Sequence, residues 1–179
     1  MLQRVFIAFL SGVDSLLPAC SFQLMTDCPM PRRTDARKTA LQMLYLIDLN
    51  PDASQEQLHH SIKQELPNPE LTEFAEQIVA GVRARRSVID SLIEKTSQNW
   101  RVGRMAPTDR NVMRLAVFEM HYLGTPSPVA INEAVELAKE FGSANSAAFV
   151  NGIIDRLTPE VLKSSPATGS GETENENSC

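Results

Sequence analysis

Helical periodicity runs through most of this 179-residue chain and limits its possible folds more than any other feature. The segment 129–156 shows it most clearly, because its apolar residues recur at intervals of three and four, as on one face of a helix. We expect Gly142 to end the first helix of this segment in a left-handed turn, with Ser143 or Asn145 capping the second. No segment of useful length alternates with period two, so the sequence predicts an all-α protein.

Start and stop signals mark two further helices in the first half of the chain. One is expected over residues 34–49, where Asn50 and Pro51 stop it. Another begins at Ser54, which can cap it with Gln57 in the capping-box position.

The middle of the chain predicts the centre of a helical bundle. A helix begins near Glu70, and its periodicity leaves open whether it continues or breaks near Arg86. Thr108 can cap a later helix, to about Leu123, that is apolar on nearly all sides and therefore belongs in the centre of a bundle. We expect about seven helices in two packed helical subdomains that divide near residues 100–107.

Four residues stand out against this helical background. Glu119 falls on the apolar stripe of the central helix, where an unpaired carboxylate is costly, so we expect a structural hydrogen-bond partner. Trp100 can stack on a base, but a lone tryptophan at a helix end is more often part of the core. We also expect Phe149 in the core, and close backbone packing at Gly152, which is costly in mid-helix.

Composition and motifs favour a non-enzymatic protein from a reducing compartment, and we expect a cytoplasmic location. Apolar residues make up 42% and charged residues 22% of the chain, and the net charge of −5 gives no hint of a nucleic-acid binder. Cys20, Cys28 and Cys179 form neither a disulfide framework nor a zinc-binding spacing. The sequence contains none of the common nucleotide-binding, nucleophile or zinc-protease motifs. We therefore expect no catalytic residue, no cofactor and no metal.

The two ends of the chain differ from the periodic region. Residues 1–31 hold a short apolar run, and we expect a disordered extension or a mis-assigned start, with Met30 or Met25 as the true one. A signal peptide is the alternative, which Asp14 and Pro18 argue against. No apolar run approaches the ~20 residues needed to span a bilayer. Residues 163–179 are predicted to form a disordered acidic tail, because they carry too few apolar groups to offset ordering entropy.

A basic cluster at the start of the first predicted helix is the main candidate for a binding site. Arg32, Arg33, Arg37 and Lys38 gather where a helix N-terminus also offers unpaired N–H groups. Guanidinium groups and N–H donors together favour a phosphate. The alternatives are a solvated basic entry to the helix and a disordered arm.

Three blocks of sequence resemble the NusB family of bacterial transcription antitermination factors, and they come in family order at plausible spacing. They are RRTDARKTALQMLY (32–45), DRNVMRLAVFEM (109–120), and VAINEAVELAKEFG followed by FVNGIIDR (149–156). The resemblance covers residues 32–162. It implies an all-α fold of two subdomains and a non-enzymatic factor that binds the boxA element of ribosomal RNA leader transcripts. It also implies joint binding with NusE, a small-subunit ribosomal protein, in the antitermination complex of RNA polymerase.

The same resemblance implies which residues bind RNA. Arg32, Arg33, Arg37 and, more loosely, Lys38 match the family's arginine-rich opening and are expected to contact phosphates. Asn151 belongs to the FVNG motif, where it can read RNA or bond a neighbouring loop. The chain departs from the denser arginine run of the family at Thr34 and Asp35, and Asp35 would repel a phosphate.

Two further matches imply a surface for the protein partner. Tyr45 ends the first family block and is expected to face NusE, although a core tyrosine is equally consistent with the pattern. Asp109 begins the central block, where an acid suits a basic ribosomal protein or simply the helix dipole. The oligomeric state is left open between monomer and homodimer.

Two other functions fit the same sequence. One is a helical protein-interaction module that binds the ribosomal partner without RNA, in keeping with Asp35 and the acidic net charge. The other is a fragment of an enzyme, because a NusB-like domain also precedes the catalytic domain of some ribosomal RNA cytosine methyltransferases. We rank the second low, since the chain leaves no room for a methyltransferase domain.

Overall fold

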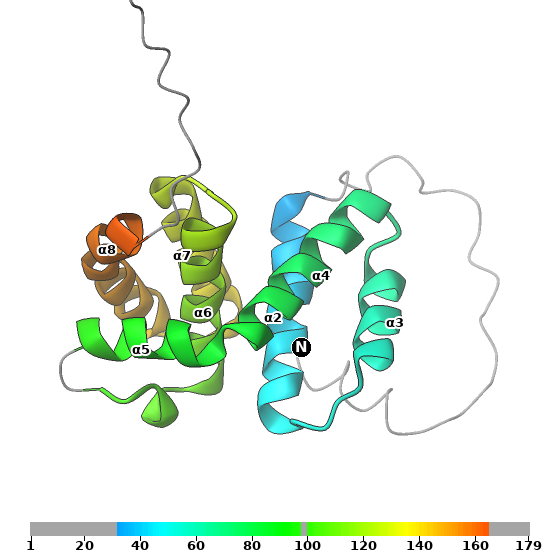
Figure 1. Cartoon of the computed structure of the whole chain (residues 1–179), viewed down its shortest axis with the longest axis horizontal. Helices are drawn as coiled ribbons and strands as arrows, with labels where there is room; N and C mark the ends of the chain where they lie inside the picture. The colour runs from blue at the N-terminus through cyan, green and yellow to red at the C-terminus, as the bar shows by residue number, and fades with distance from the viewer. Residues whose placement is uncertain (1–31, 98–99, 165–179) are drawn as a thin grey trace, which may run out of the picture. The chain divides into compact units, whose positions relative to one another are not determined.

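Seven α-helices and one 3-10 helix form the part of the chain that the structure, a computed structural model, describes: residues 32–97 and 100–164 (Figure 1). The elements are α2 (Arg33–Leu49), α3 (Gln55–Glu65), α4 (Pro69–Ala84), α5 (Arg86–Thr96), η1 (Val102–Arg104), α6 (Pro107–Tyr122), α7 (Ser127–Phe141) and α8 (Ser146–Ser164). No strand occurs in those ranges, which confirms the all-α prediction. None of these helices is long and apolar enough to cross a bilayer. The predictions for residues 1–31 and 165–179 concern residues outside the described ranges.

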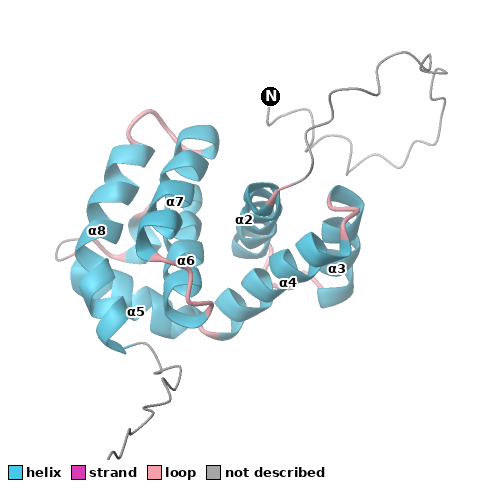
Figure 2. Cartoon of the chain, turned by 90° about the horizontal axis from the view of Figure 1, so that it is seen from above, coloured by secondary structure: helices cyan, strands magenta, loops and turns pink. Residues whose placement is uncertain are grey.

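The helices form the two groups that the sequence predicted, α2–α4 and α5–α8 (Figure 2). The division falls at Arg85 and not near residues 100–107 as expected, because α5 packs against α6 and α8. Helix α6 joins them, because it packs against α2 and α4 on one side and against α5, α7 and α8 on the other. Its residues are buried almost all round, as expected for the central helix of a bundle. One continuous apolar core therefore runs through both groups.

The helix boundaries follow local signals, except at the start of α6 and at the corner between α7 and α8. At α3 the predicted capping box is present: the Gln57 N–H donates to Ser54 Oγ at 3.2 Å, and the Ser54 N–H donates to Gln57 Oε1 at 3.3 Å. The helix that begins near Glu70 ends at Ala84, and a second helix begins at Arg86. The segment whose continuity the sequence left open therefore forms two helices, α4 and α5. The predicted Thr108 cap was wrong, because α6 already begins at Pro107, whose fixed φ suits the first helical position.

The corner between α7 and α8 is built differently from the prediction. Gly142 has φ −92° and ψ −169°, so it is extended rather than left-handed. A Cβ atom there would lie 2.4 Å from Ser146 Cβ, so the glycine is required by close packing. The Ser146 hydroxyl closes the turn by accepting the Ser143 N–H at 2.8 Å, in place of a cap from Ser143 or Asn145. Among the described glycines it is Gly124, between α6 and α7, that adopts positive φ (66°).

Two mid-helix glycines have opposite surroundings. A Cβ on Gly81 of α4 would lie 2.0 Å from Cζ of the buried Phe118 ring, so this ring of α6 packs directly against the backbone of α4. A Cβ on Gly152 of α8 would meet no atom within 4 Å. The prediction of close packing at Gly152 was therefore wrong, and the close contact lies at Gly81.

Alanine substitutions at these two glycines are expected to change stability in opposite directions. Gly81→Ala forces the Phe118 ring to move and should lower the free energy of unfolding by about 1–3 kcal/mol. Gly152→Ala removes backbone entropy from the unfolded chain without a clash and should raise it by about 0.5–1 kcal/mol. Urea denaturation followed by circular dichroism measures both. Equal effects of the two substitutions would contradict the packing described here.

Candidate nucleic-acid interface

Two exposed arginines stand at the start of α2. Arg33 lies with its guanidinium 5.1 Å from the centre of the Phe74 ring on α4, at cation–π distance. Neither Arg32 nor Arg33 forms an ion pair within the described residues. Both guanidinium groups therefore keep their hydrogen-bond donors available to an anion.

The helix N-terminus beside these arginines already carries a negative group. Asp35 Oδ2 accepts the Arg32 backbone N–H at 2.7 Å, so the chain's own carboxylate occupies part of the predicted phosphate site. A phosphate at this end of α2 would therefore meet the arginine side chains rather than the backbone N–H groups. Asp35 thus has a local structural role that the sequence pattern alone did not reveal.

Arg37 lies inside the protein, although the sequence predicted a phosphate contact. Its side chain is buried and forms a bidentate ion pair with Glu119 of α6, with Nε–Oε1 at 2.7 Å and Nη2–Oε2 at 3.0 Å. Glu133 of α7 lies 3.5 Å from Arg37 Nη1. This placement argues against the predicted RNA contact, because a phosphate would have to displace a buried carboxylate. It also supplies the partner that we expected for Glu119.

Lys38 remains near the surface but already has an anionic neighbour. Its Nζ lies 2.8 Å from Glu140 Oε2 on α7. The hydrogen bond to Glu140 raises the pKa of Lys38 above its ordinary value, so the ammonium stays charged at neutral pH. Next to it, the Thr34 hydroxyl donates to Glu133 Oε1 at 3.1 Å. Helix α7 therefore holds the first turns of α2 and partly neutralises them.

An aromatic pair joins the exposed Trp100, just before η1, to the half-buried Phe149 in the first turn of α8. Trp100 is 56% exposed, which contradicts its expected place in the core, and its ring meets the half-buried Phe149 ring edge to face at 6.1 Å. Arg101 follows directly and is exposed. Asn151, on the same helix as Phe149, donates to Asp155 Oδ2 at 3.0 Å. An aromatic surface next to arginine is a common platform for unstacked bases.

The predicted partner residues come from the adjacent halves of α2 and α6. Tyr45 is half-buried on α2, and Asp109 is 7% exposed in the first turn of α6. Asp109 Oδ1 is buried without a hydrogen-bond partner within the described residues. A buried acceptor without a donor is unusual in a folded protein.

A charge cluster centred on Asp48 joins these two helices. Asp48 carries a side chain that is 2% exposed and accepts hydrogen bonds from three arginines and one amide. The donors are Arg86 of α5 and Arg110, Asn111 and Arg114 of α6. Arg114 also pairs with Asp90 of α5 at 2.7 Å. The cluster fixes the second half of α2 against α5 and α6.

Sequence comparison decides the family of this chain. The family model described as "NusB family" matches residues 34–159. The chain belongs to the NusB family. A protein named transcription antitermination protein NusB from Anaeromyxobacter sp. (strain Fw109-5) is 49% identical over 127 residues, which are 70% of this chain and 89% of that protein.

Solved structures of NusB proteins share the fold. A structure of T. maritima NusB matches with a TM-score of 0.65 at 30% identity, over 74% of this chain and 98% of that one. A crystal structure of the antitermination factors NusB and NusE in complex with dsRNA matches with a TM-score of 0.65 at 27% identity, over 72% of this chain and 96% of that one. The match to NusB confirms the predicted family resemblance and fold.

Several residues of this NusB site were not foreseen. Phe74 supports Arg33, yet its spacing on α4 had only indicated a core residue. Glu133 and Glu140 hold α2 from a helix about one hundred residues away, and no local pattern reveals such a contact. The described residues contain no group of three or more histidine, cysteine or acidic side chains arranged to hold a metal.

Proposed function

We propose that this chain is a transcription antitermination factor that binds boxA-like leader RNA together with a NusE-type ribosomal protein. The observation that carries the proposal is the pair of exposed, unpaired guanidinium groups of Arg32 and Arg33 on a chain of net charge −5. The match to a solved NusB–NusE complex with RNA supports the choice of ligand. The factor acts without catalysis, in the cytoplasm, as part of the antitermination complex of RNA polymerase.

The arginines would position the RNA backbone, and other groups would read its bases. Arg32 and Arg33 supply sequence-independent, salt-dependent affinity through phosphates. Lys38 contributes less, because Glu140 already neutralises it. Unstacked bases would lie against Trp100 and Phe149, with the Asn151 amide in reach once it leaves Asp155.

The protein partner would bind at the other half of α2. Tyr45 offers a half-buried ring with a polar tip, a residue type that is enriched at interfaces. The Asp109 carboxylate would attract a lysine or arginine of a basic ribosomal protein, and it would form a direct hydrogen bond only after its side chain turns outward. The RNA edge, formed by Arg32 and Arg33, and the partner face around Tyr45 would thus lie on opposite halves of α2.

The double substitution Arg32→Ala and Arg33→Ala should weaken RNA binding similarly for all RNA sequences. Each lost phosphate contact should flatten the slope of log K against log salt by up to about one unit. Filter-binding titrations at several salt concentrations, with a boxA-like RNA and a scrambled RNA, measure both quantities. Lys63→Ala is a suitable control, because it removes one exposed cation on α3, away from α2's first turn.

The same titration separates the two candidate functions. A factor that binds RNA loses affinity and salt slope in the double variant and keeps both in Lys63→Ala. A protein-interaction module would bind the NusE-type partner with or without RNA and show no RNA affinity at low salt. That second outcome would contradict the proposed function.

A further inference from the structure

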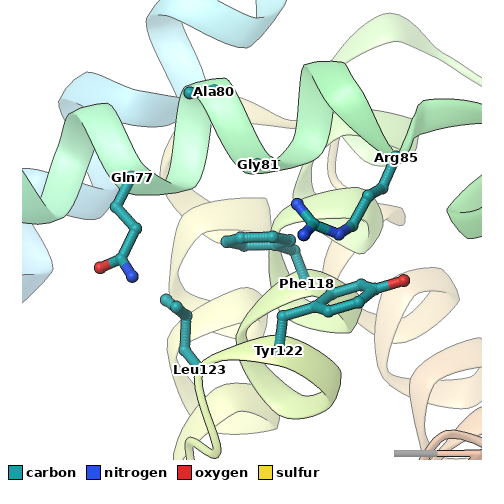
Figure 3. Close-up of a pocket in the computed structure, with 7 residues that line it drawn as sticks. All are labelled: Gln77, Ala80, Gly81, Arg85, Phe118, Tyr122 and Leu123. Carbon is teal, nitrogen blue, oxygen red and sulfur yellow. The ribbon is translucent and has the colours of Figure 1, made fainter. Parts of the chain in front are cut away.

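A hollow between α4 and α6 lies beyond the residues assigned so far. Its volume is about 400 Å³, and it opens to solvent along the last turns of both helices. Gly81 forms part of its wall, and the rings of Phe118 and Tyr122 line it from α6 (Figure 3). None of its lining residues is acidic.

Arg85 supplies the charge of this hollow. Its guanidinium stacks 4.5 Å from the centre of the Tyr122 ring and 6.0 Å from that of Phe118. Arg85 forms no ion pair with any described residue. The ring contact fixes the plane of the guanidinium and leaves its N–H groups available. A guanidinium in this arrangement can form two parallel hydrogen bonds to a phosphate.

The hollow is aligned with the RNA edge at the start of α2. Phe74, Gln77 and Gly81 follow one another at intervals of three and four, so they lie on one face of α4. Arg85 directly follows the last residue of α4, and its N–H donates to the Gly81 carbonyl at 3.2 Å, which continues this face. Arg33 stacks on Phe74 at one end of this face, and the hollow lies at its other end. Eleven residues of helix separate the two ends, a distance of about 16 Å.

The lining chemistry matches a nucleotide better than a peptide. The exposed Gln77 amide offers a donor and an acceptor to a base edge, and Tyr122 offers an aromatic face beside a guanidinium. Aromatic rings, arginine and amides are the groups that bind single-stranded RNA bases. An acidic peptide side chain would use the guanidinium but would leave the amide and the rings without a role.

We propose that the hollow formed by Gln77, Gly81, Arg85, Phe118 and Tyr122 binds one nucleotide of single-stranded RNA that extends from the Arg33 edge along α4. This inference rests on the proposed function, because it places a continuation of the same RNA. The phosphate contacts Arg85, and the base enters the hollow beside Tyr122. The bound RNA is then longer than the segment held at α2 alone.

The test compares a boxA-like RNA with the same RNA extended by a short run of uridines at either end. The full-length chain should bind one of the extended RNAs more tightly than the core RNA. Arg85→Ala should lose this gain, at least about fivefold in affinity, and Tyr122→Leu should lose a comparable part of it. Arg83→Ala should keep the gain, because it removes the same charge from the same end of α4 on another face.

The outcomes distinguish this inference from the proposed function. If core RNA binds and depends on Arg32 and Arg33, but Arg85→Ala matches Arg83→Ala on every extended RNA, the nucleotide pocket is wrong and the function stands. If Arg85→Ala lowers affinity only for the NusE-type protein, the hollow binds a peptide and the inference is overturned. If no RNA binds at low salt, the proposed function itself fails. Circular dichroism of each variant confirms folding, and the exposed Arg85 side chain makes its removal safe for the fold.

Discussion

Replacing Arg37 with methionine is expected to lower the free energy of unfolding by about 3–5 kcal/mol. The substitution leaves Glu119, which is 0% exposed, as a buried carboxylate without its bidentate partner. The loss of a desolvated charge pair is far more costly than the loss of a surface ion pair, which contributes at most about 1 kcal/mol. Urea denaturation monitored by circular dichroism measures the change.

A double variant provides the matched control. Arg37→Met combined with Glu119→Leu removes both charges and should recover most of the lost stability, because apolar replacement of a whole buried pair is often neutral. Glu133 loses its ion pair in both variants, so its contribution cancels in the comparison. If the single and double variants are equally unstable, the pair does not have the energetic role assigned to it.

RNA binding by the double variant tests the role of Arg37 directly. A buried, paired arginine does not contact a phosphate, so the salt slope of the folded double variant should equal that of the natural chain. A slope flatter by about one unit would restore the phosphate contact that the sequence had predicted. The comparison uses only variants whose folding has been verified.

Replacing Asp48 with alanine should also destabilise the protein by about 3–5 kcal/mol. The Asp48 side chain is 2% exposed and accepts hydrogen bonds from Arg86, Arg110 and Arg114, whose positive charges would then face one another. Asp52→Ala is the control, because Asp52 is an exposed acid four residues further along the chain. Urea denaturation at neutral pH compares the two, and a change below about 1 kcal/mol for Asp48→Ala would contradict the role of the cluster.

The effect of Asp48 should depend on pH with a definite sign. Burial raises the pKa of Asp48, but the hydrogen bond from Arg110 and the charges of Arg114 and Arg86 outweigh it and lower the pKa below its ordinary value. A carboxylate with a lowered pKa stabilises the folded state above its ordinary pKa of about 4, and this stabilisation is lost as the pH falls further. The difference between the natural chain and Asp48→Ala should therefore be constant near neutral pH and shrink below about pH 4.

Local signals predicted the helices well but not the contacts between them. The capping box at Ser54 and the apolar residues on nearly all sides of α6 are patterns among neighbours in sequence. The structure confirmed both the capping box and the central position of α6. The break at Arg85 could not be predicted, because the buried Val82 and Ile89 continue the helical spacing across it.

The candidate site was predicted only where its residues act locally. Arg32 and Arg33 were placed at the surface as expected, since they lie at the exposed start of a helix. Arg37 looked the same in sequence, but its partner Glu119 is 82 residues away, and only the packing of α2 on α6 brings them together. The exposure of Trp100 likewise depends on where the loop before η1 runs, which periodicity does not describe.

Helix α2 is attached to α6 at two points, Arg37–Glu119 and Asp48–Arg110, eleven residues and about 16 Å apart. One contact would let α2 change its angle to α6, whereas two contacts fix both the direction of α2 and its rotation about its own axis. If the proposed function is right, the spacing between the RNA site and the partner site is therefore set before either ligand binds. Association would then need little reorganisation of the protein, which would favour tight assembly of three components from modest individual surfaces.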